Sequence, residues 1–255
     1  MCSSDLKNVD VIACEDTRVT GILLSQLGIT GKRLIAYHEH NKAASGNGII
    51  DMLKSGLNVA EVSDAGMPAI SDPGADLASL AAVNGIEVSV IPGPSAVTAA
   101  LSISGLDTRY FHFEGFLPSE GSKRRDRLKA LTLIGETIVL YEAPHRLKKL
   151  LDELAEAGFG SCRIALCREL TKKYEEVLRM TVAEAVEYYG SNEPRGEFCI
   201  CLEPMEQKAM VEAGDGTALI ALLKSKGMSS KDIAAVVSEY TGMNKKEAYK
   251  IASES

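Results

Sequence analysis

The chain has 255 residues, 45% of them hydrophobic, and a formal net charge of −7. This apolar content supports buried cores in one large domain or in two to three small ones. No apolar run approaches the roughly 18 residues of a membrane span and no signal-peptide layout opens the chain, so we expect a cytoplasmic protein. The acidic balance argues against broad nonspecific binding of nucleic acid, but a local basic patch could still bind RNA.

The cysteines are scattered along the chain, with no Cys-x-x-Cys pair among them. Most lie in apolar, strand-like surroundings, where a thiol behaves as a small core side chain. We therefore expect core thiols, and we predict no metal site. The residues concerned are Cys2, Cys14, Cys162, Cys167, Cys199 and Cys201.

The first 117 residues alternate short apolar runs with helical patterns, after a polar start at residues 1–6 that is unlike the rest. Polar clusters end at least three strands in succession, and the alternation predicts a mostly parallel sheet. Residues 1–117 are thus predicted to form an N-terminal α/β domain. The predicted strands are 9–14, 32–37, 57–62, 87–91 and 110–113, and the predicted helices are 19–27, 43–53, 75–83 and 96–103.

The chain is organised around residues 57–74, where a short strand gives way to a loop rich in Gly, Pro, Asp and Ser. Ser71 or Asp72 can cap the following helix, with Pro73 at its first position. Open α/β sheets bind ligands at such strand-to-helix loops, where Asp64 also lies. A capped surface loop without chemistry is the alternative, but two Asp, two Pro and two Gly within eleven residues exceed what capping needs.

This loop does not match a phosphate cradle. Neither Gly-x-x-x-x-Gly-Lys nor Gly-x-Gly-x-x-Gly occurs, and two carboxylates would repel phosphate. The glycines let backbone groups approach a ligand closely, and a carboxylate can bind hydroxyls or face a cationic centre.

Residues 118–204 are predicted to form a second α/β domain, in which several strands with helices between them favour a mixed sheet. A helix over 123–133 begins with the densest basic patch in the chain, Lys123 to Arg127. Cations at a helix N-terminus oppose the helix dipole, so a binding role competes with a simple solvated helix start. The other predicted elements are strands over 137–141, 162–167, 175–180 and 198–202, and helices over 144–157 and 182–189.

Residues 205–255 are predicted to form a small helical C-terminal module. Start signals at Thr217, Ser229 and Asn244 mark three short helices. Their arrangement has a helix-turn-helix look, but acids match the lysines in number. A packing or dimer-supporting module is therefore at least as well supported as direct contact with nucleic acid.

Eight short motifs follow one another between residue 7 and about residue 203. They are VDVIACEDTR (9–18), YHEHN (37–41), VSDAGMPAISDPG (62–74), VIPGPS (90–95), FEGFLP (113–118), LYEAPHRL (140–147), CRELT (167–171) and RGE (195–197). Each motif alone is weak, but the ordered set resembles the ribosomal RNA small-subunit methyltransferase I group of the tetrapyrrole methylase superfamily. The helical tail also fits this group.

The resemblance implies a two-domain α/β tetrapyrrole-methylase-like fold, with a parallel-sheet first domain, a mixed-sheet second domain and a small helical module. It implies that S-adenosylmethionine lies folded between the domains, usually in a homodimer. It further implies transfer of the methyl group to the ribose 2′-hydroxyl of a cytidine in the decoding region of 16S rRNA. In family terms, the cofactor-binding residues are Asp64, Gly66, Met67, Pro68, Ile70, Ser71, Ser95, Ala96, Tyr141 and Gly196.

One departure from the family concerns the start of the chain. Family members normally begin with a further strand and a Pro-Ile-Gly-Asn loop ahead of the position of Lys7, and residues 1–6 contain nothing similar. In the family this strand would be central in the sheet and its loop would line the cofactor cleft. The expectation is therefore a truncated or mis-started chain whose first strand is absent.

Methyl transfer from a sulfonium is an in-line displacement, so the protein must align the nucleophile with the methyl group and exclude water. A ribose hydroxyl is a weak nucleophile, and a base near it should help. We predict His38 or Glu39 as the catalytic proton acceptor, with Glu15, Asp16 and His40 also at strand ends. The alternative is that both histidines are hydrogen-bonded loop residues. Predicted contacts with RNA are Arg18, Tyr37, His40, Asn41, Arg124, Arg125, Arg146 and Arg168.

Two other functions compete with this one. A methylase of the same fold could act on a corrin-type tetrapyrrole or on the diphthamide precursor, which would have little need for the basic patch at 123–127. A catalytically inactive RNA-binding or assembly protein would fit the absent first strand, and it would not bind the cofactor. The Glu-Asp-Thr-Arg and Tyr-His-Glu-His-Asn stretches favour the rRNA branch.

Overall fold

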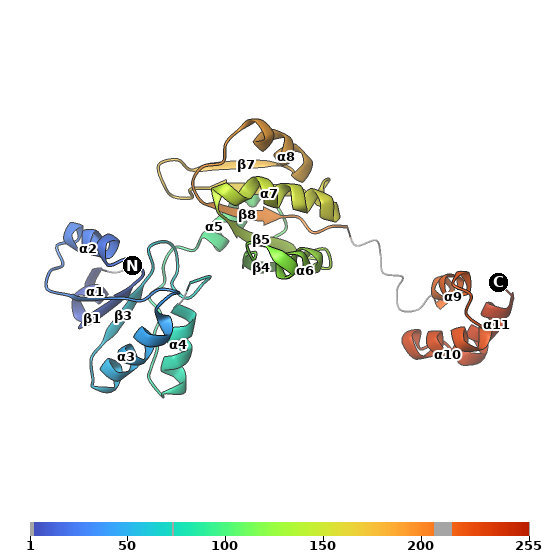
Figure 1. The fold of residues 1–255 in the computed structure, drawn as a ribbon, viewed down its shortest axis with the longest axis horizontal. Helices are drawn as coiled ribbons and strands as arrows, with labels where there is room; N and C mark the ends of the chain where they lie inside the picture. The colour runs from blue at the N-terminus through green and yellow to red at the C-terminus, as the bar shows by residue number, and fades with distance from the viewer. Residues whose placement is uncertain (1–2, 73, 207–215, 255) are drawn as a thin grey trace. The chain divides into compact units, whose positions relative to one another are not determined.

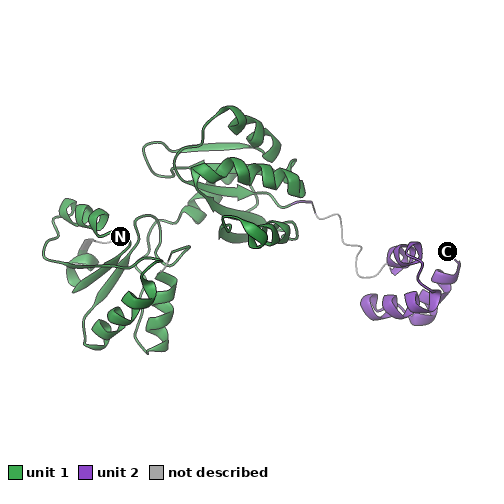
Figure 2. Cartoon of the chain, in the orientation of Figure 1, with its two compact units in different colours: residues 1–204 green, residues 205–255 purple. Residues whose placement is uncertain are grey.

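The computed structural model describes residues 3–72, 74–206 and 216–254. The chain divides into two compact units, residues 1–204 and residues 205–255 (Figure 2). The larger unit holds a sheet of three strands and a sheet of five, whose elements are labelled in Figure 1. This architecture confirms the predicted α/β class with one parallel and one mixed sheet.

The three-stranded sheet is parallel, with the order β2-β1-β3. All four residues of its central strand β1 are buried, as is usual where helices cover a parallel sheet. Because the strands are parallel, the loops that follow them meet at one edge of the sheet. The strands are β1 (Val11–Cys14), β2 (Arg33–Ala36) and β3 (Val59–Val62), followed in turn by helices α2 (Thr17–Gln26), α3 (Lys42–Lys54) and α4 (Gly74–Val83).

A helix that the sequence did not predict, α1 (Ser3–Asn8), precedes β1. Its Leu6 is buried and packs with Ile12, Leu24 and Ile29. One apolar side chain thus anchors a segment whose composition is otherwise polar.

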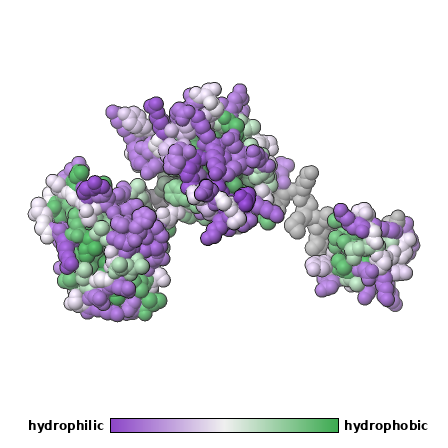
Figure 3. Space-filling view, viewed as in Figure 1, coloured by the Kyte–Doolittle hydropathy of each residue, from purple (hydrophilic) through white to green (hydrophobic). Residues whose placement is uncertain are grey.

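The strand predicted over residues 87–91 is wrong. These residues form no regular element, and Val88 and Val90 are 57% and 67% exposed. No described strand pairs with residues 87–91, so the segment lacks the ladder hydrogen bonds that define a strand. Figure 3 also shows apolar side chains on the surface around the three-stranded sheet.

The five-stranded sheet has the order β4-β5-β8-β6-β7. Its β4 runs parallel to β5, and the other neighbours are antiparallel. Strand β4 therefore lies in this sheet, although the first domain predicted over residues 1–117 includes it. The domain boundary after residue 117 stays a prediction. The strands are β4 (Phe111–Phe116), β5 (Thr137–Glu142), β6 (Arg163–Arg168), β7 (Glu176–Thr181) and β8 (Phe198–Leu202).

Helices pack on this sheet on opposite faces. Residues of α5 (Ala96–Ser104) pack against Cys167, Cys199 and their neighbours on one face. On the other face, Tyr189 of α8 (Val182–Ser191) lies 6.1 Å from Phe198 between ring centroids. The remaining helices are α6 (Gly121–Leu131) and α7 (Pro144–Leu154), and α7 continues into a π-helical turn, Ala155–Phe159.

The C-terminal unit is the predicted set of three helices, α9 (Gly216–Ser225), α10 (Ser230–Thr241) and α11 (Lys245–Glu254). Its core includes Ile220, Ile233 and Val237. Ser229 caps α10 by accepting a hydrogen bond from the backbone N–H of Asp232 at 3.2 Å, as predicted.

Five of the cysteines confirm the prediction of core thiols, and Cys2 lies outside the described residues. Within the described ranges, no helix is long and apolar enough to cross a membrane. The confirmed thiols, all buried, are Cys14, Cys162, Cys167, Cys199 and Cys201.

Candidate active site

Acidic and imidazole side chains meet at the carboxyl edge of the three-stranded sheet. Glu15 follows β1, His38 follows β2 and Asp64 follows β3. Burial raises the pKa of Glu15, the charges of Asp64 and Asp72 raise it further, and His38 lowers it. Burial and the charge of Asp16 likewise raise the pKa of Asp64. The polar clusters that follow successive strands in the sequence therefore lie close together at this edge.

The loop from residue 63 to residue 72 has a strained backbone. Ala69 and Ser71 adopt left-handed conformations, with φ of 69° and 57°. Such conformations are costly for residues with a side chain and concentrate at functional sites. The chain holds them here although neither residue is glycine, so the loop has one shape that the surrounding structure enforces.

Two glycines outside the loop lie close to it. Gly115 lies at an irregularity in the pairing of β4 with β5, with φ of 70°. A Cβ atom at Gly115 would lie 2.6 Å from the Ser71 Oγ atom, so only glycine fits. A Cβ atom at Gly93 would lie 3.9 Å from the Met67 sulfur, which is ordinary contact. The loop after β3 is thus in contact with residues of two later motifs.

The end of the loop is fixed by an acidic pair. The Asp72 carboxylate accepts a hydrogen bond from the Gly74 N–H at 2.9 Å, in agreement with the predicted cap. The Glu61 carboxylate occupies the space where a Cβ atom of Gly74 would lie, only 2.1 Å from that position. Pro73, predicted at the first helical position, lies outside the described residues. Burial, with the charge and hydrogen bond of Asp72, raises the pKa of Glu61 to about 7.

The raised pKa of Glu61 makes stability depend on pH. The folded chain holds a proton on Glu61 up to about pH 7, whereas the ordinary pKa is 4.5, so the free energy of unfolding falls as pH rises between these values. Glutamine can donate to Asp72 without a charge. Glu61→Gln should therefore raise the free energy of unfolding at pH 8 by about 1 kcal/mol, discounted for solvent screening, and raise Tm by about 2–4 °C.

Thermal melts at pH 4.5 and pH 8 test this expectation. Little difference from the wild type is expected at pH 4.5, where Glu61 is protonated in the folded chain and about half protonated in the unfolded chain. Glu136→Gln, at an exposed position, is the matched control and should show no pH-dependent difference. An equal change in Tm at both pH values for Glu61→Gln would contradict the assigned pKa.

An aromatic group lies at the carboxyl end of β5. The Tyr141 ring packs edge-on against Phe113 at 5.2 Å and lies 5.4 Å from Phe116. Burial raises the pKa of the Tyr141 hydroxyl to about 12, so the hydroxyl stays a neutral hydrogen-bond donor. The Cys199 thiol, on the same face, donates to the Ala96 carbonyl at 3.4 Å. Tyr141 and the start of α5 at Ser95 and Ala96 are therefore neighbours.

Gly196 has a packing role. Its φ is 74°, and a Cβ atom there would lie 2.5 Å from the Glu169 Cγ atom. The neighbouring Glu197 N–H donates to Glu169 Oε1 at 2.9 Å. The contact joins the loops beside β6 and β8, and the predicted cofactor role of Gly196 stays a prediction.

The Tyr37–Asn41 cluster separates into buried and accessible parts. The prediction that Tyr37 contacts RNA is wrong, because Tyr37 is only 3% exposed and packs with Ile49 and Leu77 in the core. Asn41 closes the turn, accepting from the His38 N–H at 2.8 Å and donating to the Ala36 carbonyl at 2.9 Å.

The two predicted proton acceptors differ in surroundings. The Glu39 carboxylate is 66% exposed and pairs with Lys42 at 2.8 Å. The His38 Nδ1 atom is buried and has no hydrogen-bond partner among the described residues. The rings of His38 and His40 lie 6.1 Å apart between centroids.

Known proteins share this sequence pattern. A sequence profile of the tetrapyrrole (corrin/porphyrin) methylases matches residues 5–186. The protein named ribosomal RNA small subunit methyltransferase I of Halalkalibacterium halodurans is 43% identical over 255 residues, covering 96% of this chain and 86% of that protein. The chain belongs to this methyltransferase family.

Solved structures share the fold of this methyltransferase family member. A diphthine synthase superposes with a TM-score of 0.62 at 14% identity, covering 79% of this chain and 82% of the other. A uroporphyrin-III C-methyl transferase from Thermus thermophilus, complexed with S-adenyl homocysteine, gives 0.55 at 17% identity, covering 78% and 87%. These likenesses confirm the predicted tetrapyrrole-methylase-like fold.

The basic patch of the methyltransferase contributes less to the surface than its sequence suggested. The prediction that Arg124 contacts RNA is wrong: Arg124 is 2% exposed, and its Nε atom donates to Glu153 at 2.7 Å. Arg127 pairs with Glu114. Arg125 on the same helix is exposed, so one turn of α6 points one arginine inward and another outward.

The other predicted RNA contacts keep some exposure. Arg18 is 87% exposed at its side chain and holds Asp16, whose pKa it lowers to about 2. Arg146 is 22% exposed and pairs with Glu142 at 3.0 Å. Arg168 is 24% exposed and lies 3.3 Å from Glu176.

Several residues of the site were missed in the sequence. From the sequence, Glu61 was placed in an ordinary strand and Gly74 was given no role beyond the end of the capped loop. Gly115 lay within the FEGFLP motif, but nothing in the motif indicated contact with Ser71. The same motif contains two aromatic residues, Phe113 and Phe116, which could have indicated an aromatic group around Tyr141.

Proposed function

We propose that this chain transfers a methyl group from S-adenosylmethionine to the ribose 2′-hydroxyl of a cytidine in the decoding region of 16S rRNA. Membership of the ribosomal RNA small subunit methyltransferase I family supports the reaction class and the RNA substrate. The observation that carries the proposal is the strained loop over residues 63–72, held against Gly115 beside the acidic strand ends.

The shape and chemistry of this region suit the cofactor. The exposed Asp64 carboxylate can accept hydrogen bonds from ribose hydroxyls. Ile70 is 44% exposed, which offers an apolar contact for a base. The residues that would hold the cofactor are Asp64, Gly66, Met67, Pro68, Ile70, Ser71, Ser95, Ala96, Tyr141 and Gly196. S-Adenosylmethionine supplies a methyl group on a sulfonium centre.

The protein's own part in the reaction is to position the ribose and to receive a proton. His38 is the proposed acceptor, because it lies near Glu15 at the strand ends and its Nδ1 atom lacks a hydrogen-bond partner within the described part of the chain. The exposed guanidinium groups suit phosphate oxygens as forks. Arg18, His40, Asn41, Arg125, Arg146 and Arg168 are the proposed RNA contacts, and we propose a homodimer in the cytoplasm.

Calorimetric titration with S-adenosylmethionine tests the cofactor part of this proposal. The wild type should bind, and Asp64→Asn should bind about tenfold more weakly, because a hydrogen bond to a charged group is lost. Asp51→Asn, which removes an exposed carboxylate from α3, is the matched control and should bind like the wild type. A wild type that releases no heat would refute the cofactor assignment, and equal affinity of both variants would remove Asp64 from it.

A further inference from the structure

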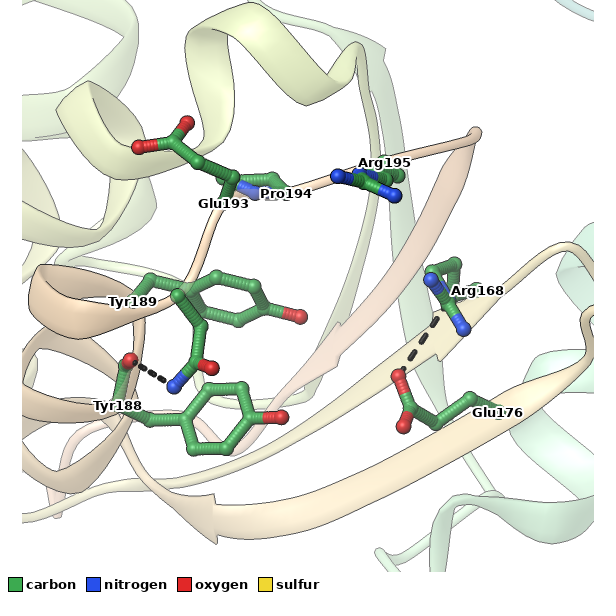
Figure 4. Close-up of a pocket in the computed structure, with 8 residues that line it drawn as sticks. Arg168, Glu176, Tyr188, Tyr189, Glu193, Pro194 and Arg195 are labelled. Atoms are coloured by element: carbon green, nitrogen blue, oxygen red, sulfur yellow. Dashed lines mark hydrogen bonds and ion pairs between the residues drawn. The ribbon is translucent and has the colours of Figure 1, made fainter.

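A separate pocket lies on the five-stranded sheet. It has a volume of about 320 Å³ and is lined by Arg168 and Glu176 from neighbouring strands, by two tyrosines of α8 and by the segment before β8. Figure 4 shows the hydroxyls of Tyr188 and Tyr189 pointing across the cavity toward the side where Arg168 and Glu176 lie, with the Arg195 guanidinium above them. The pocket is within the size range of small-molecule sites.

The pocket opens on the face of the sheet opposite to Tyr141. Residues paired across neighbouring strands share a face, so Arg168 shares one with Phe198 and Glu176. By the same pairing Tyr141 shares the other face with Cys199. This pocket is therefore distinct from the group at Tyr141, Ser95 and Ala96.

Tyr141 and Arg168 lie on opposite faces of the sheet but at the same end of it, where strands β5 and β6 finish. Strands β5 and β6 are each antiparallel to β8, so they are parallel to one another. Tyr141 is near the carboxyl end of β5, and Arg168 is at the carboxyl end of β6. An extended ligand that contacts Tyr141 on one face can pass around this end of the sheet to Arg168 on the other face.

The charges in the pocket leave cationic donors available. Glu176 lies 3.3 Å from the Arg168 Nε atom, which has no hydrogen bond within the described residues. Arg195 is exposed, and no described acidic group pairs with it. The other acid of the lining, Glu193, pairs with Lys148 at 2.6 Å. The two arginines of the lining are thus matched by two glutamates, and Arg195 is the lining cation that has no acidic partner among the described residues.

The tyrosines add an aromatic wall with polar ends. Their rings pack edge-on at 5.0 Å, and Tyr188 is 37% exposed. Burial raises the pKa of Tyr189 to about 12, so its hydroxyl stays a donor. Guanidinium forks beside an exposed aromatic ring are the combination that binds the phosphate and base of single-stranded RNA.

We propose that this pocket binds one unpaired nucleotide of the substrate RNA, with its phosphate on Arg195 and Arg168 and its base against Tyr188. The inference rests on the proposed function and names an anchor for the RNA beyond the methyl-transfer site. Such an anchor holds the substrate but touches neither the cofactor nor the reacting atoms. Its loss should therefore raise KM and leave kcat unchanged.

The test uses small ribosomal subunits that lack the modification, S-adenosylmethionine and the full chain. Arg195→Gln should raise KM for the subunits about tenfold, and the salt dependence of binding should weaken by about one phosphate contact. Tyr188→Leu should have a similar effect on KM, whereas Tyr188→Phe, which keeps the ring, should stay near the wild type. Lys54→Gln removes an exposed cation from the end of α3 and is the charge-matched control.

Binding to deproteinised 16S RNA and to S-adenosylmethionine completes the design. The proposal requires Arg195→Gln to weaken RNA binding in both subunits and naked RNA, with unchanged affinity for the cofactor. A defect seen with subunits but not with naked RNA would assign the pocket to a ribosomal protein and overturn the inference. So would a loss of cofactor affinity, or behaviour equal to Lys54→Gln. Failure of the proposed function is distinct, because then the wild type itself methylates no subunits.

Discussion

Replacing Arg124 with methionine should lower the free energy of unfolding by about 3–5 kcal/mol, because it removes a buried cation that pairs with Glu153 and lies beside the buried Glu142. The Arg124 side chain donates to Glu153 at 2.7 Å and to the Pro118 carbonyl at 2.8 Å, and it lies 3.9 Å from Glu142. Glu142 is 1% exposed, and burial raises its pKa. The arginine thus joins α6, β5 and α7.

Urea unfolding of Arg124→Met measures this loss. Arg125→Gln, one residue further on the exposed side of α6, is the matched control and should change the free energy of unfolding by no more than about 0.5 kcal/mol. If Arg124 contacted RNA instead, its replacement would weaken RNA binding without changing stability. A loss below 1 kcal/mol for Arg124→Met would contradict the structural role.

Replacing His38 with alanine should lower kcat for RNA methylation by about 10²-fold or more, because general-base catalysis contributes typically 10²–10⁴-fold. The affinity for S-adenosylmethionine should stay unchanged, since His38 follows β2 and lies outside the loop over 63–72 that is proposed to hold the cofactor. Single-turnover methylation of small subunits measures the effect on the chemical step.

Glu39→Gln is the companion variant. Glu39 is exposed and pairs with Lys42, and Lys42 also pairs with Asp76 at 2.5 Å. Removing the Glu39 charge should therefore change kcat little. The two variants together separate the acceptors that the sequence left open. A His38→Ala, Glu39→Gln double variant with full turnover would exclude both as the base.

The three strands whose ends form the site were predictable from the sequence. Apolar runs followed by polar clusters predicted β1, β2 and β3, and parallel pairing is enough to bring Glu15, His38 and Asp64 to one edge. Their convergence needed no knowledge of side-chain packing.

Features that depend on contacts between distant parts of the chain could not be predicted from the sequence. Residues 87–91 have the apolar alternation of a strand, but a strand also needs a partner, which the pattern does not report. Arg124 and Arg125 are adjacent in sequence, and helix geometry alone does not say which of them faces the core. The pocket at Arg195 depends on the pairing of β6 with both β7 and β8.

Analysis of the methylated nucleoside tests the central claim most directly. Small subunits that lack the modification are incubated with the chain and S-adenosylmethionine, and the 16S rRNA is digested for mass spectrometry of nucleosides and of decoding-region fragments. We expect 2′-O-methylcytidine in one decoding-region fragment, and none when the cofactor is omitted. A base-methylated nucleoside, or methyl transfer to a corrin-type tetrapyrrole with none to RNA, would contradict it.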